Sequence, residues 1–472
     1  MLDQSFSARN YEVIFNLANR KGQIKLSEMP NEYQNIVERL KDLKKRRFEI
    51  KKKKRADWTP DDSQNYNLLT TQINEVKEQK QQRLYEYLTE IADKTSGHFK
   101  LELNKHVDPN SGKDVYQVID DGSRMAFYTI KQLQYNIQKI FKVQQANRHA
   151  ILTNIKALLN SRLPLYIIRT DISEFYESIP QKRLLGYITD NTLLNSRSVA
   201  YIKGIIEEYD IKTSQSIDIG KGIPRGVAIS PLLSEIYMRD IDSSIRERQE
   251  VIFYARYVDD IFMVLTSLNG ETIDGYFNNL KQLFQKYGLT LHAIGDKSKL
   301  IDLYNESKNI TESLTYLGYK LSIEKKGRDI VTIFSLSDNK KQKIINRIDN
   351  IFSYFEEQSK YNVKQARDFL FNGLKYIAGN NRLKGAKSRI KIGIYYNNDL
   401  IDKVDELDEI TNYLYAKVVN PSHNKFGTDE ELNNYIQHIK KAILKINFRE
   451  NWINKKMYSL SSETIKEIQY RL

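Results

Sequence analysis

The stretch VIFYARYVDDIFMVL, residues 251–265, places two adjacent acids, Asp259 and Asp260, in an otherwise apolar and aromatic run. Its flanks are rich in β-branched and aromatic residues, which favour strands, and only Val258 and Asp259 separate them. The pattern therefore predicts a β-hairpin with the acids at its tip. Taken alone the signal is weak, because Asp is a common turn residue whose side chain hydrogen-bonds its own backbone.

A third acid suggests a chemical role for this pair. Asp171 ends the apolar run LYIIRTDI, residues 165–172, where a carboxylate is costly to bury unless it is paired or binds a metal. Acids brought together repel unless a divalent ion lies between them, and two Mg²⁺ ions suit phosphoryl transfer. The chain has no cysteine, so any metal needs oxygen or imidazole ligands. We therefore expect two Mg²⁺ ions here, with Mn²⁺ as the alternative.

The charge balance favours a polyanionic partner. The sequence has 74 Lys and Arg against 60 Asp and Glu, a formal net charge of +14, and nucleic acid is the leading candidate. A codon bias toward A and T would also enrich Lys and is an alternative cause.

Two basic segments are candidates for phosphate contacts. Residues 44–55, KKRRFEIKKKKR, are suited to contact phosphates, and a solvated helix face explains them equally well. The segment RLKGAKSRIKI, residues 382–392, has the same two readings. The residues expected to bind nucleic acid in these segments are Lys51, Lys52, Lys53, Lys54, Arg55, Lys387 and Arg389.

Pattern changes along the chain predict three regions: a helical basic extension over 1–95, a mixed α+β centre over 96–335 and a helical region over 336–472. The loop VDPNSG, residues 107–112, predicts another β-hairpin in the central region. No apolar run approaches the roughly 18 residues of a membrane span, and the first residues lack a signal-peptide layout. A cytoplasmic protein that does not contact a membrane is therefore the default expectation.

Five motifs occur in an order that resembles one family. They are RTDISEFYESIP (169–180), GIPRGVAISPLLSEIYM (222–238), RYVDDIFMV (256–264), LTLHAIGDKS (289–298) and YLGYKLS (316–322). Together they resemble the palm motifs of reverse transcriptases. The resemblance implies an α+β right-hand polymerase with fingers, palm and thumb, here with a helical N-terminal extension and an all-helical C-terminal region. It also implies that Asp171, Asp259 and Asp260 are catalytic and, with Ile172, bind the metal ions.

The same resemblance implies roles for other residues. Tyr176 falls at the sugar-gate position, and Leu317 and Gly318 fall in the primer-grip turn. Lys297 or Lys299 lies near the position that protonates pyrophosphate. The residues implied to bind the nucleotide are Arg124, Tyr176, Arg225, Gly226 and Lys297. Two positions depart from the family pattern: Arg225 replaces the usual Gln, and His292 stands where Asn is common. Arg225 would then hold a phosphate or change the choice of template.

Within this family, the segments MLDQSFSARN, NRKG (19–22), FYESI and SRIKIGIYYNNDL are most similar to bacterial defence-associated reverse transcriptases, in particular to the first enzyme of the type that pairs two such enzymes with a noncoding RNA. That placement implies antiviral defence, an RNA template, a DNA product made from deoxynucleotides, a companion reverse transcriptase and a homo- or hetero-oligomer. The alternatives are an RNA-dependent RNA polymerase and a non-catalytic RNA-binding subunit of a polymerase complex.

Overall fold

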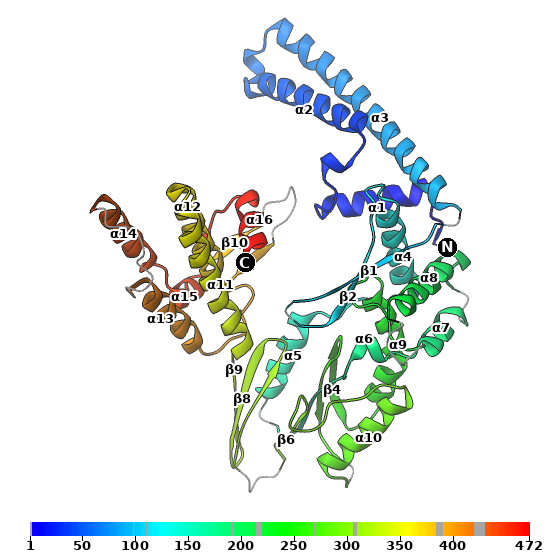
Figure 1. Ribbon diagram of the computed structural model, residues 1–472, viewed down its shortest axis with the longest axis vertical. Coiled ribbons are helices and arrows are strands. Elements are labelled where there is room, and N and C mark those ends of the chain that lie inside the picture. The colour runs from blue at the N-terminus through cyan, green and yellow to red at the C-terminus, as the bar shows by residue number, and fades with distance from the viewer. Residues whose placement is uncertain are drawn as a thin grey trace. The chain divides into compact units, whose positions relative to one another are not determined.

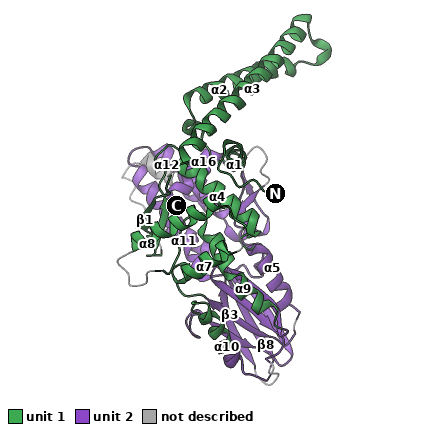
Figure 2. Ribbon diagram, turned by 90° about the vertical axis from the view of Figure 1, so that its right-hand side faces the viewer, with its two compact units in different colours: residues 1–146, 172–248, 278–291 green, residues 147–171, 249–277, 292–472 purple. Residues whose placement is uncertain are grey.

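The computed structural model describes residues 2–97, 99–109, 111–161, 163–190, 193–213, 220–268, 270–304, 309–383, 390–419 and 430–472. The chain forms two compact units, shown in green and purple in Figure 2. Unit 1 comprises residues 1–146, 172–248 and 278–291, and unit 2 comprises residues 147–171, 249–277 and 292–472. The sequence-based division at residues 95 and 335 stays a prediction.

Unit 1 is mainly helical and contains one two-stranded sheet. The strands β1 and β2 pair antiparallel around the loop that the sequence predicted as a hairpin turn, so that prediction is confirmed. The elements of unit 1 are α1 (Ala8–Arg20), α2 (Asn31–Lys52), α3 (Pro60–Thr95), β1 (Leu103–Val107), β2 (Asp114–Val118), α4 (Met125–Phe141), α6 (Phe175–Ser178), α7 (Gln181–Thr189), α8 (Ser196–Thr213) and α9 (Ser230–Arg246), with 3-10 turns at Leu26–Glu28 and Arg55–Asp57.

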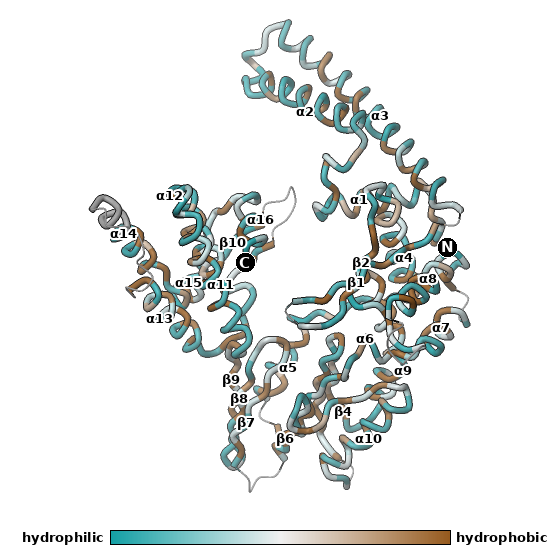
Figure 3. The backbone as a smooth tube through the Cα atoms, in the orientation of Figure 1, coloured by the Kyte–Doolittle hydropathy of each residue, from teal (hydrophilic) through white to brown (hydrophobic). Residues whose placement is uncertain are grey.

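Helices α2 and α3 lie side by side as a hairpin (Figures 1 and 2). Figure 3 shows that most of their length is hydrophilic. Their contact is a narrow apolar seam formed by the buried side chains of Leu40, Leu43, Ile73 and Val76. Helix α3 begins sharply at Thr59, whose hydroxyl accepts from the Asp62 amide while the Asp62 carboxylate accepts from the Thr59 amide.

Unit 2 is built on a four-stranded sheet in the order β4-β5-β3-β6, with every neighbouring pair antiparallel. Its strands are β3 (Tyr166–Asp171), β4 (Val251–Tyr257), β5 (Asp260–Leu265) and β6 (Lys299–Asp302). After Asp260 the inner strand β5 is apolar, and the side chains of Ile261 to Leu265 are fully buried. Burial on both faces explains why this strand shows no alternation of polar and apolar residues.

A second sheet of unit 2 has the order β7-β8-β9, formed by Ile310–Tyr316, Tyr319–Lys326 and Asp329–Leu336. The other elements of this unit are α5 (Arg148–Leu159), α11 (Asp338–Gln358), α12 (Val363–Ala378), β10 (Asn380–Arg382), β11 (Lys391–Gly393), α13 (Asp405–Val419), α14 (Glu430–Ile443), α15 (Phe448–Ile453), β12 (Met457–Tyr458) and α16 (Ser462–Arg471). Helix α10 (Ile273–Lys286) spans the boundary between the two units.

The predicted α+β class is confirmed, and one detail of it is corrected. The region after residue 336 is not all-helical, because β10, β11 and β12 form a small three-stranded sheet within it. Strands of two or three residues are too short to show a sequence period, so their pairing depends on partners distant in the chain. No helix in the described part of the chain is long and apolar enough to span a membrane.

Candidate active site

The hairpin that carries the paired acids has a two-residue turn, as the sequence predicted. Tyr257 pairs with Asp260, and Val258 and Asp259 form the turn between β4 and β5. Val258 has a positive φ of 61°, a conformation in which a β-branched residue is strained. The buried Arg256 donates a hydrogen bond of 2.9 Å to the Val258 carbonyl. Surrounding contacts therefore hold this turn in a conformation that the sequence does not favour locally.

The sheet brings Asp171 to this hairpin. Strand β3 pairs with β5 so that Asp171, its last residue, lies directly opposite Asp260. Facing side chains of an antiparallel pair have Cβ atoms about 5 Å apart, and like charges in this arrangement repel. Three carboxylates from two neighbouring strand ends thus gather at one end of the sheet.

The carboxylate of Asp260 is compensated by Arg169, a residue that the sequence reasoning did not identify. Arg169 Nη2 donates to Asp260 Oδ1 at 2.6 Å, and Arg169 Nη1 donates to the Lys297 carbonyl. The pKa of Asp260 is raised to about 6: burial is the largest cause, the charges of Asp171 and Asp259 add to it, and Arg169 opposes it. Arg169 lies two residues before Asp171, so the period of a strand puts both side chains on one face. This two-residue spacing is the sequence signal that could have identified Arg169 as a residue of the site.

Two other side chains lie within contact distance of the Asp171 carboxylate. Its Oδ1 lies 3.2 Å from Lys297 Nζ and 3.3 Å from His292 Nε2. His292 is held in turn by Asp296, whose Oδ2 is 2.7 Å from His292 Nδ1, and its amide donates to the Asp171 carbonyl at 3.0 Å. Lys297, predicted to lie near the pyrophosphate, therefore lies beside a catalytic candidate. Lys299, the other candidate for that position, instead pairs with Glu312 at 2.6 Å.

The three acids have the chemistry of a site for hard cations. Mg²⁺ prefers carboxylate oxygens. Burial and, after it, the charges of Asp171 and Asp259 raise the Asp260 pKa, and a divalent ion would relieve the repulsion among these charges. Within the described ranges, no group of three His, Cys, Asp or Glu side chains is arranged as a metal site. The carboxylates of Asp171 and Asp260 are instead turned to protein cations.

Unit 1 holds the other residues that the sequence assigned to the nucleotide. Tyr176 lies in the single turn α6 and is 9% exposed. Ile172, also predicted at the metal site, is buried and forms a β-bridge with Leu291. Gly226 has φ +94°, and a Cβ there would lie 2.7 Å from the Tyr116 carbonyl, so the backbone requires glycine.

Two predicted nucleotide-binding cations of unit 1 have carboxylate partners. The Arg225 guanidinium is bonded to Glu177 through two hydrogen bonds of 3.0 and 3.1 Å. Arg124 begins α4 with φ +65° and contacts Glu28 at 3.5 Å and Asp120 at 3.6 Å. Its guanidinium also lies 3.9 Å from the centre of the Phe127 ring. In this structure both charges are compensated by the protein, and their roles toward a nucleotide stay predictions.

The predicted primer-grip residues form a tight turn in unit 2. Leu317 and Gly318 connect β7 to β8, and both have positive φ, of 45° and 76°, as a type I′ turn requires. Arg148, at the start of α5, donates from Nε to the Leu317 carbonyl at 3.1 Å and also from Nη2. A residue 169 positions away thus fixes this turn.

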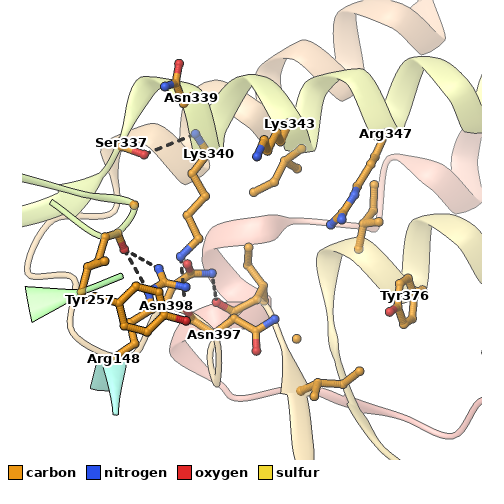
Figure 4. Close-up of a pocket in the computed structure, with 17 residues that line it drawn as sticks. Arg148, Tyr257, Ser337, Asn339, Lys340, Lys343, Arg347, Tyr376, Asn397 and Asn398 are labelled. Carbon is orange, nitrogen blue, oxygen red and sulfur yellow. Dashed lines mark hydrogen bonds between the residues drawn. The ribbon is translucent and has the colours of Figure 1, made fainter. Parts of the chain in front are cut away.

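A basic pocket of about 500 Å³ opens beside this turn, within unit 2 (Figure 4). It is lined by Arg148, Tyr257, Leu317, Gly318, Ser337, Asn339, Lys340, Lys343, Ile344, Arg347, Tyr376, Ile377, Ile392, Gly393, Ile394, Asn397 and Asn398. In Figure 4 the side chain of Lys340 extends from α11 toward Arg148 and Asn397. Burial, then the charge of Arg148, lowers the pKa of Lys340 to about 8. The pocket is thus lined by Tyr257, the residue before the Val258–Asp259 turn, by the primer-grip turn, and by three cations of α11, Lys340, Lys343 and Arg347.

The predicted nucleic-acid contacts of residues 51–55 lie at the end of α2 and in the following loop, and all five side chains are exposed. Lys52 pairs with Glu49 at 2.8 Å and Lys53 with Asp62 at 2.9 Å. In the part of the chain that the structure describes, Lys51, Lys54 and Arg55 have no ion pair, so their charges are available to a partner. Lys387 and Arg389 lie outside the described residues.

The sheet of unit 2 is antiparallel and carries carboxylates at the ends of the adjacent strands β3 and β5, an arrangement that agrees with the right-hand polymerase palm implied by the sequence motifs. Residues 112–321 match the family described as "Reverse transcriptase (RNA-dependent DNA polymerase)". The chain therefore contains a reverse transcriptase domain, and its enzymatic class is RNA-directed DNA polymerase.

Solved telomerase structures also resemble the chain. One, from Candida albicans in complex with a fragment of telomeric RNA, is 13% identical with a TM-score of 0.34, and the match covers 80% of this chain and 67% of that one. Apo telomerase from Candida tropicalis is 14% identical with a TM-score of 0.36, and the match covers 79% and 64% of the two chains. No curated protein sequence matches the chain.

Proposed function

We propose that this polymerase adds deoxynucleotides to a primer with two Mg²⁺ ions held by Asp171, Asp259 and Asp260, with the Ile172 carbonyl beside them. The observation that carries the proposal is the register of β3 and β5, which sets Asp171 opposite Asp260 at the end of the acidic hairpin. When bound, the ions would lower the pKa of the attacking 3′-hydroxyl and stabilise the charge of the phosphates. This mechanism predicts the results for the Asp171 and Asp259 variants developed in the Discussion.

The protein's own groups would do the rest of the work. Arg169 holds the Asp260 carboxylate beside Asp171 and prevents it from turning away from the site. Lys297 contacts Asp171 and is half-exposed, so its ammonium group is placed to give a proton to the departing pyrophosphate. Tyr176 would lie against the sugar and exclude a 2′-hydroxyl, which makes deoxynucleotides the substrates. Extension of one primed RNA template with deoxynucleotides and then with ribonucleotides tests this; a clear preference for ribonucleotides would indicate an RNA polymerase instead.

The basic pocket of unit 2 is proposed to hold phosphates of the primer strand. Lys340, Lys343 and Arg347 recur along one face of α11 beside the Leu317–Gly318 turn, and Arg148 adds a fourth cation. Phosphate contacts by Lys and Arg supply most of the affinity of such surfaces, and they weaken with salt.

Lys340 gives this pocket a testable pH dependence. A bound phosphate favours the charged form, so affinity for a primer–template duplex should be full below pH 8 and fall as the pH rises toward 9, by roughly three- to tenfold for loss of one contact. Fluorescence anisotropy at constant ionic strength measures this. The Lys340→Arg variant should bind equally well at pH 7 and 9, and Lys299→Arg, outside the pocket, should behave as the wild type. The same fall in Lys340→Arg would assign the dependence to another group.

The tip of the α2–α3 hairpin is proposed to bind the RNA partner. Replacing Lys51, Lys54 and Arg55 with Gln should reduce the slope of log affinity against log salt by about 0.7–0.9 for each lost contact, or roughly 2–3 in total. Replacing Lys52 and Lys53 should have a smaller effect, because Glu49 and Asp62 already neutralise them. Filter binding of the copurifying RNA between 50 and 300 mM salt measures the slopes. Equal slopes in the wild type and the triple variant would mean that these basic residues are a solvated surface that does not contact RNA.

The biological role we propose is antiviral defence in a bacterium, with a noncoding RNA as template and a companion reverse transcriptase. The sequence resemblance to defence-associated reverse transcriptases supports it. Plaque assays on cells carrying the wild-type or Asp171→Asn gene test the role, and sequencing the copurified nucleic acid identifies the template. Protection that survives in the Asp171→Asn strain would separate the role from polymerisation.

A further inference from the structure

In unit 1, Arg225 and Glu177 form an ion pair, here called the clamp, whose guanidinium lies against the Tyr176 ring. Arg225 Nε donates to Glu177 Oε1 at 3.0 Å and Nη2 to Glu177 Oε2 at 3.1 Å, a two-bond contact that fixes the plane of the guanidinium. The same guanidinium lies 5.1 Å from the centre of the Tyr176 ring, within the range of a cation–π contact. The Arg225 guanidinium thus lies on the ring of Tyr176, and Glu177, the residue that follows Tyr176 in the chain, holds the guanidinium in place.

The backbone places both halves of this clamp. The Ile223 amide donates to the Tyr176 carbonyl and the Gly222 amide to the Ile179 carbonyl, each at 2.8 Å. On the other side, the Tyr116 amide donates to the Arg225 carbonyl at 2.7 Å. The segment 222–226 is therefore hydrogen-bonded both to α6 and to β2. These backbone bonds fix the main chain of Arg225 independently of its side-chain contacts.

The local structure of Tyr176 alone would not hold its ring. Helix α6 is a single turn of four residues, too short to be stable by itself. A sugar gate works by steric exclusion, so a ring that yields by about 1 Å loses discrimination, and such positions depend on support from neighbouring side chains. The Arg225 guanidinium, which Glu177 holds in place, contacts the ring and provides that support.

From these contacts we infer that Arg225 and Glu177 are positioning residues that fix the Tyr176 ring and so determine how strongly ribonucleotides are rejected. The inference rests on the proposed function, in which Tyr176 contacts the sugar. It differs from the sequence-based expectation for Arg225, because the guanidinium acts through a tyrosine and a carboxylate of its own chain and not through a phosphate of the substrate.

The test compares kcat/KM for a deoxynucleotide with that for the matching ribonucleotide on one RNA template. Arg225→Gln and Glu177→Gln should each reduce this ratio by about tenfold, because the ring contact and the bidentate bond are lost together. Arg225→Lys keeps the positive charge but cannot form the two parallel hydrogen bonds of a guanidinium to Glu177, so it should give an intermediate ratio. The exchange variant with Glu177→Arg and Arg225→Glu should recover part of the loss. Thermal melting of each variant identifies those that fail to fold.

A matched control exists in the same unit. The Arg183 guanidinium lies 4.5 Å from the centre of the Tyr287 ring and donates to the Lys286 carbonyl at 3.0 Å. Arg183→Gln removes a comparable contact away from the proposed site and should leave the ratio unchanged.

Three outcomes separate the inference from the proposal on which it rests. If Tyr176→Ala lowers the ratio but Arg225→Gln and Glu177→Gln do not, the clamp is wrong and the gate stands. A rise in the deoxynucleotide KM with an unchanged ratio in Arg225→Gln would also overturn the clamp, because it would mean that Arg225 binds the triphosphate. If Tyr176→Ala leaves the ratio unchanged, the gate itself fails, whatever the clamp variants do.

Discussion

Replacing Asp259 with Asn is expected to reduce nucleotide addition on the order of 10³-fold or more, and Asp171→Asn should do the same. Each substitution keeps the size of the side chain and removes a negative charge at the point where carboxylates of β3 and the β4–β5 hairpin meet. In the proposed mechanism each substitution removes one metal ligand, and the loss of several kcal/mol of charge stabilisation corresponds to a rate loss of this size. Primer extension on an RNA template, followed by single-turnover kinetics, measures the effect.

Two controls sharpen this prediction. Asp302 ends β6 and pairs across β3 with Tyr166, at the opposite end of that strand from Asp171, so Asp302→Asn should retain full activity. RNA binding by Asp171→Asn and Asp259→Asn should stay within about twofold of the wild type, because the phosphate contacts that we propose are made by other residues. Full synthesis by the double variant would instead mean that the acids are turn residues and that the chain's role is to bind RNA.

Replacing Arg169 with Leu is expected to destabilise the metal-free protein by about 2–4 kcal/mol at pH 8. Arg169 and Asp260 are 16% and 24% exposed at their side chains, so removal of the cation leaves a largely buried carboxylate without its partner. The pKa of Asp260 is raised to about 6 in the folded protein from 3.8, and loss of Arg169 would raise it further. Because the folded state then binds more protons, the cost should be present above this pKa and shrink as the pH falls toward 5.

Urea unfolding in EDTA at pH 5 and pH 8 measures this difference. The matched control is Lys299→Leu, on a strand of the same sheet, which breaks the more exposed pair with Glu312 and should cost less than about 1 kcal/mol at either pH. Arg169→Lys should lie between the wild type and Arg169→Leu, since a lysine can pair with Asp260 but lacks the second arm that reaches the Lys297 carbonyl. An equal cost at both pH values would mean that Arg169 acts through packing alone.

The sequence was sufficient for the parts of the site that depend on local patterns. The hairpin turn at Val258 and Asp259 followed from two β-rich flanks separated by two residues, and the structure confirms it. The hairpin at residues 103–118 followed from a Pro/Asn/Gly loop and is confirmed as well. The family match over residues 112–321 agrees with the five ordered motifs, because motif order and spacing are properties of the chain itself.

Tertiary structure alone decided which charges compensate each other. Nothing in the motif PRG indicated that Arg225 would bond to Glu177, 48 residues earlier, and lie on the Tyr176 ring. His292 and Lys297 reach Asp171 across more than 120 positions, and Arg148 reaches the Leu317 turn across 169. Strand and turn propensities act over a few neighbouring residues, whereas the partner of a buried charge is whichever cation or acid the packed sheets bring within reach. The sequence by itself therefore determined the acids, the turns and their order along the chain, and the tertiary structure determined the contacts that hold them in place.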